Sequence, residues 1–371
     1  MRLGLIYHQF APGGGLENYL LEFAARLRAD GHELHLVTSN VTNEVQSRLD
    51  AVVHRIKLPR RGTLLRQWRF DHVASRIAAQ LPVDATIAFG RTTTQDLHRA
   101  SGGCHRTYSR LLPPWKRWSL KNLLELHLEK RLYTSGKTEL FIVNSSLAGR
   151  QIQQEYGIAP DHLRLIYTAI DTERYHPAEN RAALKAEISI SVHADPVRPA
   201  FLFVSRDHRR KGLEVLLDIW SEVNADLWIA GKPLGKARWR KIDNRGLRSK
   251  IYYFPEGADL ARLFRAADWF VHPTLYDACA NTVLQSMASG LPGLISSCDG
   301  AVEFLRDGEN GFVLPRPRDE ASVLAVVRRA LSSDESVRRR LALAARETMM
   351  PLTWDAHLEK WMSAIGEIRE R

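Results

Sequence analysis

Short apolar runs alternate along this chain with longer segments in which apolar residues recur at helical spacing. Leu3 to His8 is one such run, and Leu16 to Asp30 is the helical segment that follows it. Strands separated by helices form βαβ units, which build parallel sheets covered by helices on both faces. The same rhythm restarts at Ala200, so the chain is predicted to be α/β with two doubly wound halves. The other expected strands are Glu33–Ser39, Ala85–Phe89 and Leu140–Asn144, then FLFVS, DLWIAG, IYYF and WFVHP in the second half.

A length of 371 residues allows two domains that each bury a core. The stretch from Asp171 to Pro199 is polar and contains proline, which is typical of an inter-domain connection. We therefore expect one Rossmann-like domain over residues 1–170 and a second over residues 171–353. The last helix, at about residues 354–371, is expected to pack back on the first domain.

The net charge of +11 favours partners that carry phosphate, such as nucleic acid, an anionic membrane or a phosphorylated substrate. The three cysteines (Cys104, Cys279 and Cys298) include no CxxC pair, which argues against a disulfide framework or a zinc site. MRLGLIYHQF runs straight into a strand and lacks the features of a signal peptide. No apolar run approaches the roughly 18 residues that span a bilayer, so we expect a cytosolic protein.

Three glycines, Gly13, Gly14 and Gly15, stand between the first strand and the first helix. Glycines there permit a tight turn and let backbone N–H groups approach an anion at the helix N-terminus. A dinucleotide fingerprint would need its last glycine where this chain has Asn18, and an acidic residue where it has Ser39 and Asn40. The glycines therefore do not indicate a dehydrogenase. Two interpretations remain, a purely structural turn or a turn that faces another ligand.

A basic loop, Arg206 to Gly212, follows the buried strand FLFVS and precedes a helix. Ligands of open α/β sheets bind outside the carboxyl ends of the strands, so four cations there suit a diphosphate. The alternative is a solvated surface loop.

A third motif, Asp277 to Gln285, spans the start of an apolar helix whose first N–H groups would favour an anion. Its alternative is that Asp277 or Asn281 simply caps the helix.

These motifs together resemble the retaining glycosyltransferases of family 4, which have the GT-B fold of two facing Rossmann-like domains and an inter-domain cleft. The resemblance is carried by SRDHRRKG, DLWIAG, the long stretch from YYFPEG through SMASGLPGLIS, DGENGFVL and the N-terminal GGGLENYLLEFAARLRADGHELHLVTS. AFGRTTTQDLH and LEKRLYTSGKTELFIVNSS are similar to the lipopolysaccharide core glucosyltransferase I group.

The resemblance implies a role for each matching residue. Arg206 and Lys211, with Arg210, would hold the donor diphosphate, and Asp277 would contact the donor sugar as the first acidic residue of an E-x7-E motif. Donor binding is also implied for Gly14 and Gly15 beside the transferred sugar, Asn281, Thr282 and Val283 at the phosphates, Gln285 at the ribose, and the segment 253–257 with Phe254 at the base. The family's chemistry needs no metal and no enzymic nucleophile. Arg206, Lys211 and Asp277 would be the catalytic groups.

Two positions depart from the family pattern, because Asp277 and Gln285 replace glutamates. Asp is shorter by one methylene, and Gln loses the charge that strengthens ribose contacts, at a cost of about 1 kcal/mol. These departures keep a non-catalytic nucleotide-sugar binder as an alternative to an enzyme. A sugar-nucleotide 2-epimerase and a polyanion-binding adaptor are weaker alternatives. UDP-glucose is the donor that the subgroup implies.

Residues 105–121 mix cations with tryptophan and leucine, a composition that suits an anionic membrane surface and a lipid-borne acceptor. The alternative is a basic helix with ordinary packing tryptophans. RNA could use such residues too, but the chain carries no RRM, KH or zinc signature, so no nucleic-acid partner is expected. The acceptor is expected to be a phosphorylated lipid-linked oligosaccharide. The candidate acceptor contacts are Glu17, Arg91, Asp96 and His105.

Overall fold

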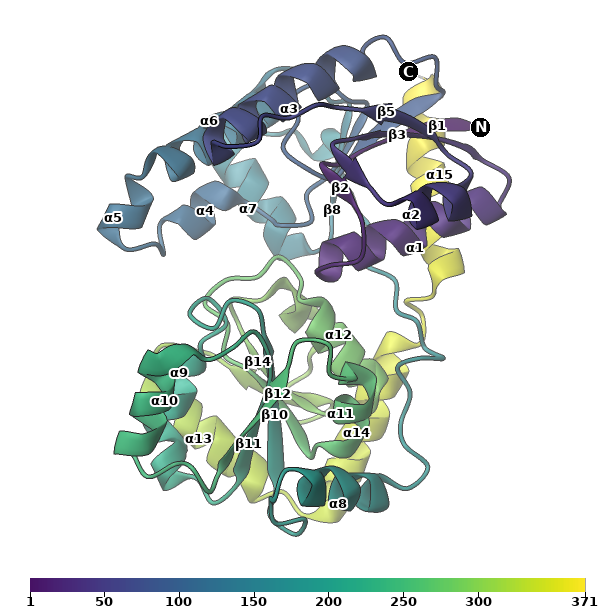
Figure 1. The fold of residues 1–371 in the computed structure, drawn as a ribbon. Coiled ribbons are helices and arrows are strands. Elements are labelled where there is room, and N and C mark those ends of the chain that lie inside the picture. Colours follow the sequence, from purple (N-terminus) through teal and green to yellow (C-terminus); the bar gives the residue numbers. More distant parts are fainter. Residues whose placement is uncertain (371) are drawn as a thin grey trace. The chain divides into compact units, whose positions relative to one another are not determined.

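The computed structural model describes residues 1–370 and divides the chain into two compact units (Figure 1). The first comprises Met1–Tyr167 together with the C-terminal segment that begins at His357, and the second comprises Thr168–Ala356. Each unit contains a parallel sheet with helices on both of its faces, which makes the chain α/β as expected. Along the described part of the chain, no helix is both long enough and apolar enough to cross a membrane.

The first unit has a seven-stranded sheet in the order β5-β3-β1-β6-β7-β8-β9. All of its strand pairs are parallel. The strands are β1 (Arg2–Ile6), β3 (Glu33–Thr38), β5 (Val52–Arg55), β6 (Ala85–Ala88), β7 (Leu97–Arg99), β8 (Leu140–Val143) and β9 (Leu163–Leu165), and a small separate pair is formed by β2 (Gln9–Phe10) and β4 (Asn40–Val41). The helices are α1 (Gly15–Ala29), α2 (Asn43–Leu49), α3 (Thr63–Ala78), α4 (His105–Ser109), α5 (Pro114–Arg117), α6 (Leu120–Thr134), α7 (Ser146–Tyr156), η1 (Pro160–His162) and α15 (Trp354–Glu370).

The second unit has a six-stranded parallel sheet in the order β12-β11-β10-β13-β14-β15. Its strands are β10 (Ala200–Ser205), β11 (Asp226–Gly231), β12 (Ile251–Pro255), β13 (Trp269–His272), β14 (Gly293–Ser296) and β15 (Gly311–Leu314). Its helices are α8 (Arg181–Ser191), α9 (Leu213–Ile219), η2 (Trp220–Glu222), α10 (Gly235–Asn244), α11 (Leu260–Ala266), α12 (Asn281–Ala288), η3 (Gly300–Phe304), α13 (Glu320–Leu331) and α14 (Glu335–Met349).

Apolar packing explains why these strands read as continuous hydrophobic runs. All residues of β10 and β13 are buried, as expected for parallel strands that are covered on both sides. One core lies between this sheet and α9, α10 and α13, and the other lies between the sheet and α8, α11, α12 and α14 (Figure 1). Only the ends of the strands are left for polar chemistry.

Two expectations from the sequence need correction. Residues 171–199 are not a plain connection, because they contain α8, which follows the N-cap residue Asn180 and packs Leu184 and Ile188 against the core. The first strand ends at Ile6 rather than His8, and β2 follows it before the glycine turn. The sequence did not predict α8, because the segment around it is polar and the buried face of the helix has only a few apolar residues.

The C-terminal helix α15 completes the core of the first unit. The indole of Trp361 is fully buried, with ring centroids 5.1 Å from Phe23 and 6.3 Å from Phe89. His357 accepts hydrogen bonds from the Tyr19 hydroxyl (2.8 Å) and the Trp361 indole N–H (3.1 Å) at Nε2, while its Nδ1 donates to the Tyr167 carbonyl. Residues more than 300 positions apart therefore share one buried network.

We expect Trp361→Ala to lower the free energy of unfolding by about 3–5 kcal/mol, because it leaves a large cavity beside α1. Thermal melting of the full chain would measure this as a lower Tm. The neighbouring exposed residue provides the control, since Lys360→Ala should leave Tm almost unchanged. Equal melting temperatures for Trp361→Ala and the wild type would contradict the packing described for α15.

Candidate functional site

The second unit has a topological switch point between β10 and β13. Strands added after β10 extend the sheet to β11 and β12 on one side, and to β13, β14 and β15 on the other. The loops that leave β10 and β13 therefore diverge from a common crevice at the carboxyl edge of the sheet, where ligands of doubly wound folds bind. The basic loop Arg206–Gly212 and the segment before α12 are these two loops.

Close backbone approach holds the two loops together. The Leu275 N–H donates to the Arg210 carbonyl at 2.8 Å, and the Thr274 hydroxyl donates to the same oxygen. Gly212 has a φ of +81°, and a Cβ at this position would lie 2.1 Å from the Pro273 carbonyl oxygen. Only glycine fits this position, and it places Lys211 directly over the end of β13.

Two cations of the basic loop converge on one carboxylate. Asp277 Oδ2 lies 2.6 Å from Lys211 Nζ and 2.9 Å from Arg210 Nη1. Burial alone would raise the pKa of Asp277, but the charges of Lys211 and Arg210 outweigh it and lower the pKa to about 2. The carboxylate is therefore ionised at neutral pH. Arg210 has a second partner in Asp207, at 3.7 Å. The four cations of the loop still outnumber these two carboxylates, so the net charge at this edge of the sheet is positive.

A buried histidine and a buried aspartate lie beneath Lys211. His272 Nε2 is 3.3 Å from Lys211 Nζ and 3.1 Å from Asp299 Oδ2, and both His272 and Asp299 are fully buried. Burial, and then the charge of Lys211, lower the pKa of His272, so the ring is neutral. His272, Asp277 and Asp299 could offer three metal-ligand atoms within 4.8 Å of one another. We do not assign a metal there, because the Lys211 ammonium already occupies the space beside Asp277 and His272.

The start of α12 is capped by neither of the residues that the sequence suggested. Ala280 is the N-cap residue, and the Asp299 carboxylate accepts a hydrogen bond from its N–H at 3.1 Å. Asp277 instead pairs with the basic loop, and Asn281 is the first helical residue. The Thr282 hydroxyl is buried without a hydrogen-bond partner in residues 1–370. The Val283 N–H, which was expected to face the phosphates, already donates to the Ala280 carbonyl at 2.9 Å. Within the first turn of α12, the N–H groups of Asn281 and Thr282 are those available to an anion.

The remaining donor candidates lie at the surface or in the core. Arg206 forms an exposed ion pair with Glu256 at 2.9 Å, which contributes little to stability. The Gln285 side chain lies on α12 and makes no hydrogen bond with any other part of the described chain. Phe254 packs its ring against Trp228 in the core, with centroids 5.6 Å apart. The ring is therefore engaged in packing, and its contact with the base stays a prediction.

The glycine turn of the first unit is closed by its own acidic residue. Glu17 Oε2 accepts a hydrogen bond from the Gly14 N–H at 2.8 Å, and Oε1 accepts one from the Tyr7 hydroxyl at 3.0 Å. Gly15 is the first residue of α1. Burial, and then the charge of Glu17, raise the pKa of Tyr7. Glu17 is thus a capping residue that also orients Tyr7, and its contact with an acceptor stays a prediction.

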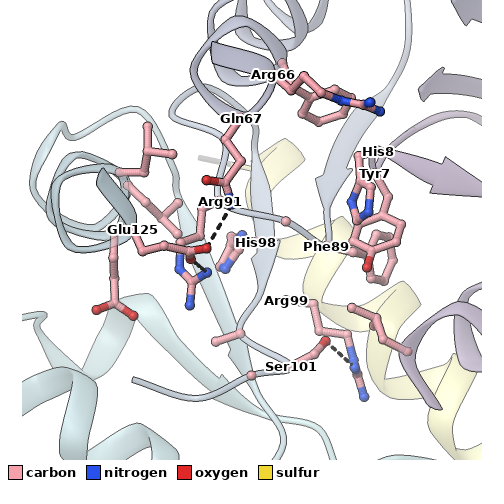
Figure 2. Close-up of a pocket in the computed structure, with 18 of the residues that line it drawn as sticks. Tyr7, His8, Arg66, Gln67, Phe89, Arg91, His98, Arg99, Ser101 and Glu125 are labelled. Atoms are coloured by element: carbon pink, nitrogen blue, oxygen red, sulfur yellow. Dashed lines mark hydrogen bonds and ion pairs between the residues drawn. The ribbon is translucent and has the colours of Figure 1, made fainter. Parts of the chain in front are cut away.

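A cavity of about 450 Å³ lies at the carboxyl edge of the first sheet. Tyr7 and His8 follow β1, Phe89 to Arg91 follow β6, and α3 and α6 supply other walls. Figure 2 shows Tyr7, His8 and Arg66 on one side, with Arg91 and Glu125 on the other. Arg91 forms an ion pair with Glu125, which also accepts a hydrogen bond from Gln67 at 2.8 Å. The cavity is thus lined by aromatic rings and by charged groups.

His98 is the buried imidazole of this cavity. It is 4% exposed, and its Nδ1 makes no hydrogen bond to any residue in the described range. Burial, and then the charge of Arg91, lower its pKa to about 3, so the ring is neutral at physiological pH. A neutral imidazole can donate from one nitrogen and accept at the other, which suits recognition of a hydroxyl group.

Two other residues predicted to contact the acceptor make hydrogen bonds within the first unit, and their contact with an acceptor stays a prediction. The Asp96 carboxylate accepts hydrogen bonds from the N–H and the hydroxyl of Thr86, at 2.7 and 2.8 Å. The His105 ring bonds to the Asn122 side chain at 2.8 Å. Neither residue lines the cavity, whereas Arg91 does. The cavity residues that the sequence analysis missed are Tyr7, His8, Arg66, Gln67, His98, Arg99 and Glu125. The one feature of the sequence that could have identified them is that several of them follow a strand.

Two family models match consecutive parts of the chain. The model described as Glycosyltransferase Family 4 matches residues 13–174, and the model described as Glycosyl transferases group 1 matches residues 198–333. Lipopolysaccharide glucosyltransferase WaaG of Escherichia coli (strain K12) is 19% identical over 352 residues, which cover 90% of each chain.

Solved structures share the fold. A crystal structure of WaaG, a glycosyltransferase involved in lipopolysaccharide biosynthesis, matches with a TM-score of 0.82 at 18% identity over 98% of each chain. The Anabaena protein Alr3699/HepE in complex with UDP and glucose matches with a TM-score of 0.74 at 16% identity, over 99% of this chain and 100% of that one. These likenesses establish the fold of the present chain.

We expect Asp277→Asn to destabilise the second unit by about 3 kcal/mol, because it removes the carboxylate that pairs with Lys211 and leaves Arg210 with only its more distant partner Asp207, at 3.7 Å. Chemical denaturation would measure the loss, and added pyrophosphate should restore more stability to this variant than to the wild type. Glu256→Gln, which breaks the exposed pair with Arg206, is the control and should change stability by less than about 0.5 kcal/mol. Equal losses in the two variants would show that the pairing of Asp277 is unimportant.

Proposed function

Because this chain belongs to the family 4 glycosyltransferases, enzymes with the GT-B fold, we propose that it transfers a hexose from a nucleotide sugar to a lipid-linked glycan. The observation that carries the proposal is the convergence of Lys211 and Arg210 at the switch point of the second unit. We propose a UDP-sugar, with UDP-glucose as the default, because a similar structure holds UDP-glucose and a relative is a glucosyltransferase.

In this proposal the second unit, close to the expected residues 171–353, binds the donor. The diphosphate would lie against Lys211, Arg210 and the first turn of α12, with Arg206 reaching it from the surface. A diphosphate competes with Asp277 for the same two cations, so its arrival would free the Asp277 carboxylate to accept hydrogen bonds from the sugar hydroxyls. Gln285 would contact the ribose.

The proposed reaction proceeds with retention of anomeric configuration. The bond between the anomeric carbon and the diphosphate oxygen breaks, and its electron pair leaves with the diphosphate. The acceptor oxygen bonds to the anomeric carbon on the same face, and its proton passes to the departing diphosphate. Lys211 and Arg210 would stabilise the negative charge that develops on the leaving group, which is usually the largest contribution of such a site. No metal is required for this step.

The first unit would bind the acceptor in its cavity. Arg91 is fixed by Glu125, and His98 offers a neutral imidazole, so both can hydrogen-bond to sugar hydroxyls. Tyr7 and Phe89 provide aromatic surface in the same cavity, which suits the apolar faces of a sugar ring. The acceptor would be a lipid-linked oligosaccharide such as the inner core of lipopolysaccharide.

An exposed aromatic segment would bring the protein to its lipid-linked acceptor. Trp115 and Trp118 on and after α5 are 72% and 73% exposed, and Leu120 at the start of α6 is 73% exposed. These side chains are therefore not ordinary packing residues. The cations Lys116, Arg117 and Lys121 alternate with them. Indole rings at headgroup level beside cations favour anionic lipid, so we propose a peripheral location on the cytoplasmic face of the inner membrane.

A second candidate function is a nucleotide-sugar binder without activity. The observation that favours it is the replacement of two family glutamates by Asp277 and Gln285, of which the first is bound to Lys211 and Arg210. Such a protein would bind the donor and release no nucleotide diphosphate.

The decisive experiment incubates the purified chain with UDP-, GDP- and ADP-sugars, with and without deep-rough lipopolysaccharide, and measures free nucleotide diphosphate. We expect acceptor-dependent release from one donor. Lys211→Ala should reduce kcat by about a hundredfold or more, because a cation at the leaving group is lost. Lys232→Ala, at an exposed position directly after β11, is the matched control. Donor binding without release would favour the second candidate, and absence of both would contradict the proposal.

Membrane attachment can be tested on vesicles that contain phosphatidylglycerol. We expect Trp115→Ser combined with Trp118→Ser to weaken sedimentation with these vesicles about tenfold or more, because two interfacial rings are lost. Leu343→Ser removes a side chain that is 62% exposed on α14 of the other unit, and it should leave binding unchanged. Unaltered binding of the double tryptophan variant would exclude this segment as the anchor.

A further inference from the structure

A second hollow, of about 560 Å³, opens beside the cavity of the first unit. The two share His8, Ser39, Leu58 and Arg66 in their walls, so they are continuous. The hollow lies at the carboxyl ends of β1, β3 and β5, and its remaining walls include Arg55 and Lys57. We call it the basic groove and define it by Arg55, Lys57 and Arg66.

The basic groove contains three cations and no acidic side chain. No carboxylate of residues 1–370 lies within 4.0 Å of the charged atoms of Arg55, Lys57 or Arg66, although Arg91 nearby has such a partner. Three like charges around one hollow repel one another, and a bound oxyanion would relieve the repulsion. Charge and shape therefore both indicate a site for an anionic group.

Helix α3 adds to the positive potential at the same place. It begins at Thr63, which lines the cavity, and Arg66 stands about one turn further on. Its N-cap residue, Gly62, supplies no capping side chain, and its first turn contains no acidic residue. The positive end of the helix macrodipole is thus not compensated by the protein, and it reinforces the attraction of the three cations for an anion.

We propose that the basic groove binds a phosphate group carried on the acceptor sugar, while the adjoining cavity holds the sugar itself. This inference rests on the proposed function, because it requires the acceptor to bind in the first unit. A lipid surface fits the groove less well, since its apolar side chains are limited to Leu58 and the buried Ile56 and it has no exposed tryptophan. A compact hollow with cations on its walls suits one phosphate and its sugar.

Calorimetry on the full chain can test this directly. The probes are the deacylated oligosaccharide of deep-rough lipopolysaccharide with its phosphate groups, and the same oligosaccharide after removal of phosphate with hydrofluoric acid. We expect Arg55→Gln combined with Lys57→Gln to raise the Kd for the phosphorylated probe about tenfold or more, because two charge-assisted contacts are lost. The Kd for the dephosphorylated probe should stay the same.

A matched variant controls for net charge. Arg48→Gln combined with Arg150→Gln also removes two exposed cations from the first unit, at positions outside the groove, and should change neither Kd. Inorganic phosphate should compete with the phosphorylated probe alone. Circular dichroism and Tm of the groove variant confirm that it is folded, since both substituted side chains are exposed.

Several results would overturn the inference. Equal affinity of the wild type for both probes would do so, as would a groove variant that weakens both probes equally. Loss of phosphatidylglycerol vesicle binding in the groove variant, with both Kd values unchanged, would show instead that the groove contacts lipid. Phosphate-dependent binding without sugar transfer from any donor would contradict the proposed function but support this inference. Sugar transfer to an acceptor whose affinity does not depend on phosphate would support the proposed function and contradict this inference.

Discussion

The burial of both faces of each parallel sheet is the constraint on which the rest of this structure depends. Helices cover the sheets on two sides, so the strands are filled with apolar residues and polar groups are pushed to the strand ends. The polar groups that can bind a ligand therefore lie on the loops after β10 and β13 in the second unit, and on the loops after β1 and β6 in the first. Lys211, Arg210, His272 and both hollows are found at the carboxyl edges of the two sheets.

Local patterns in the sequence were sufficient for most of the fold but for only part of the site. The apolar runs of β10 and β13 predict strands, and the basic loop and the start of α12 follow from their positions beside those strands. The pairing of Asp277 with Lys211 could not be predicted, because it depends on a backbone approach at Gly212 that only the folded chain shows. The cavity was also missed, since Tyr7, His98 and Glu125 come from separate elements and share no motif.

Charge balance explains why Lys211, Arg210 and Asp277 can be stable together and still be suited to binding an anion. A lysine this deeply placed beside a neutral imidazole would be costly without a counter-charge, and Asp277 supplies one. Asp277 is shared between Lys211 and Arg210, and Arg210 has a more distant second partner in Asp207, at 3.7 Å. A ligand with two or more negative charges can replace the single carboxylate with a gain in attraction. The shorter side chain at position 277 keeps the carboxylate close to the loop.

The network of Tyr19, His357 and Trp361 also has a consequence for the order of folding during synthesis. Tyr19 and His357 are 338 positions apart, and the whole second unit lies between them. As the ribosome works from the N-terminus, the second unit can close its core while the first still lacks the indole that fills the space beside Phe23. The unit that is translated first is thus completed last, and until then its exposed apolar surface makes the nascent chain a natural client for chaperones.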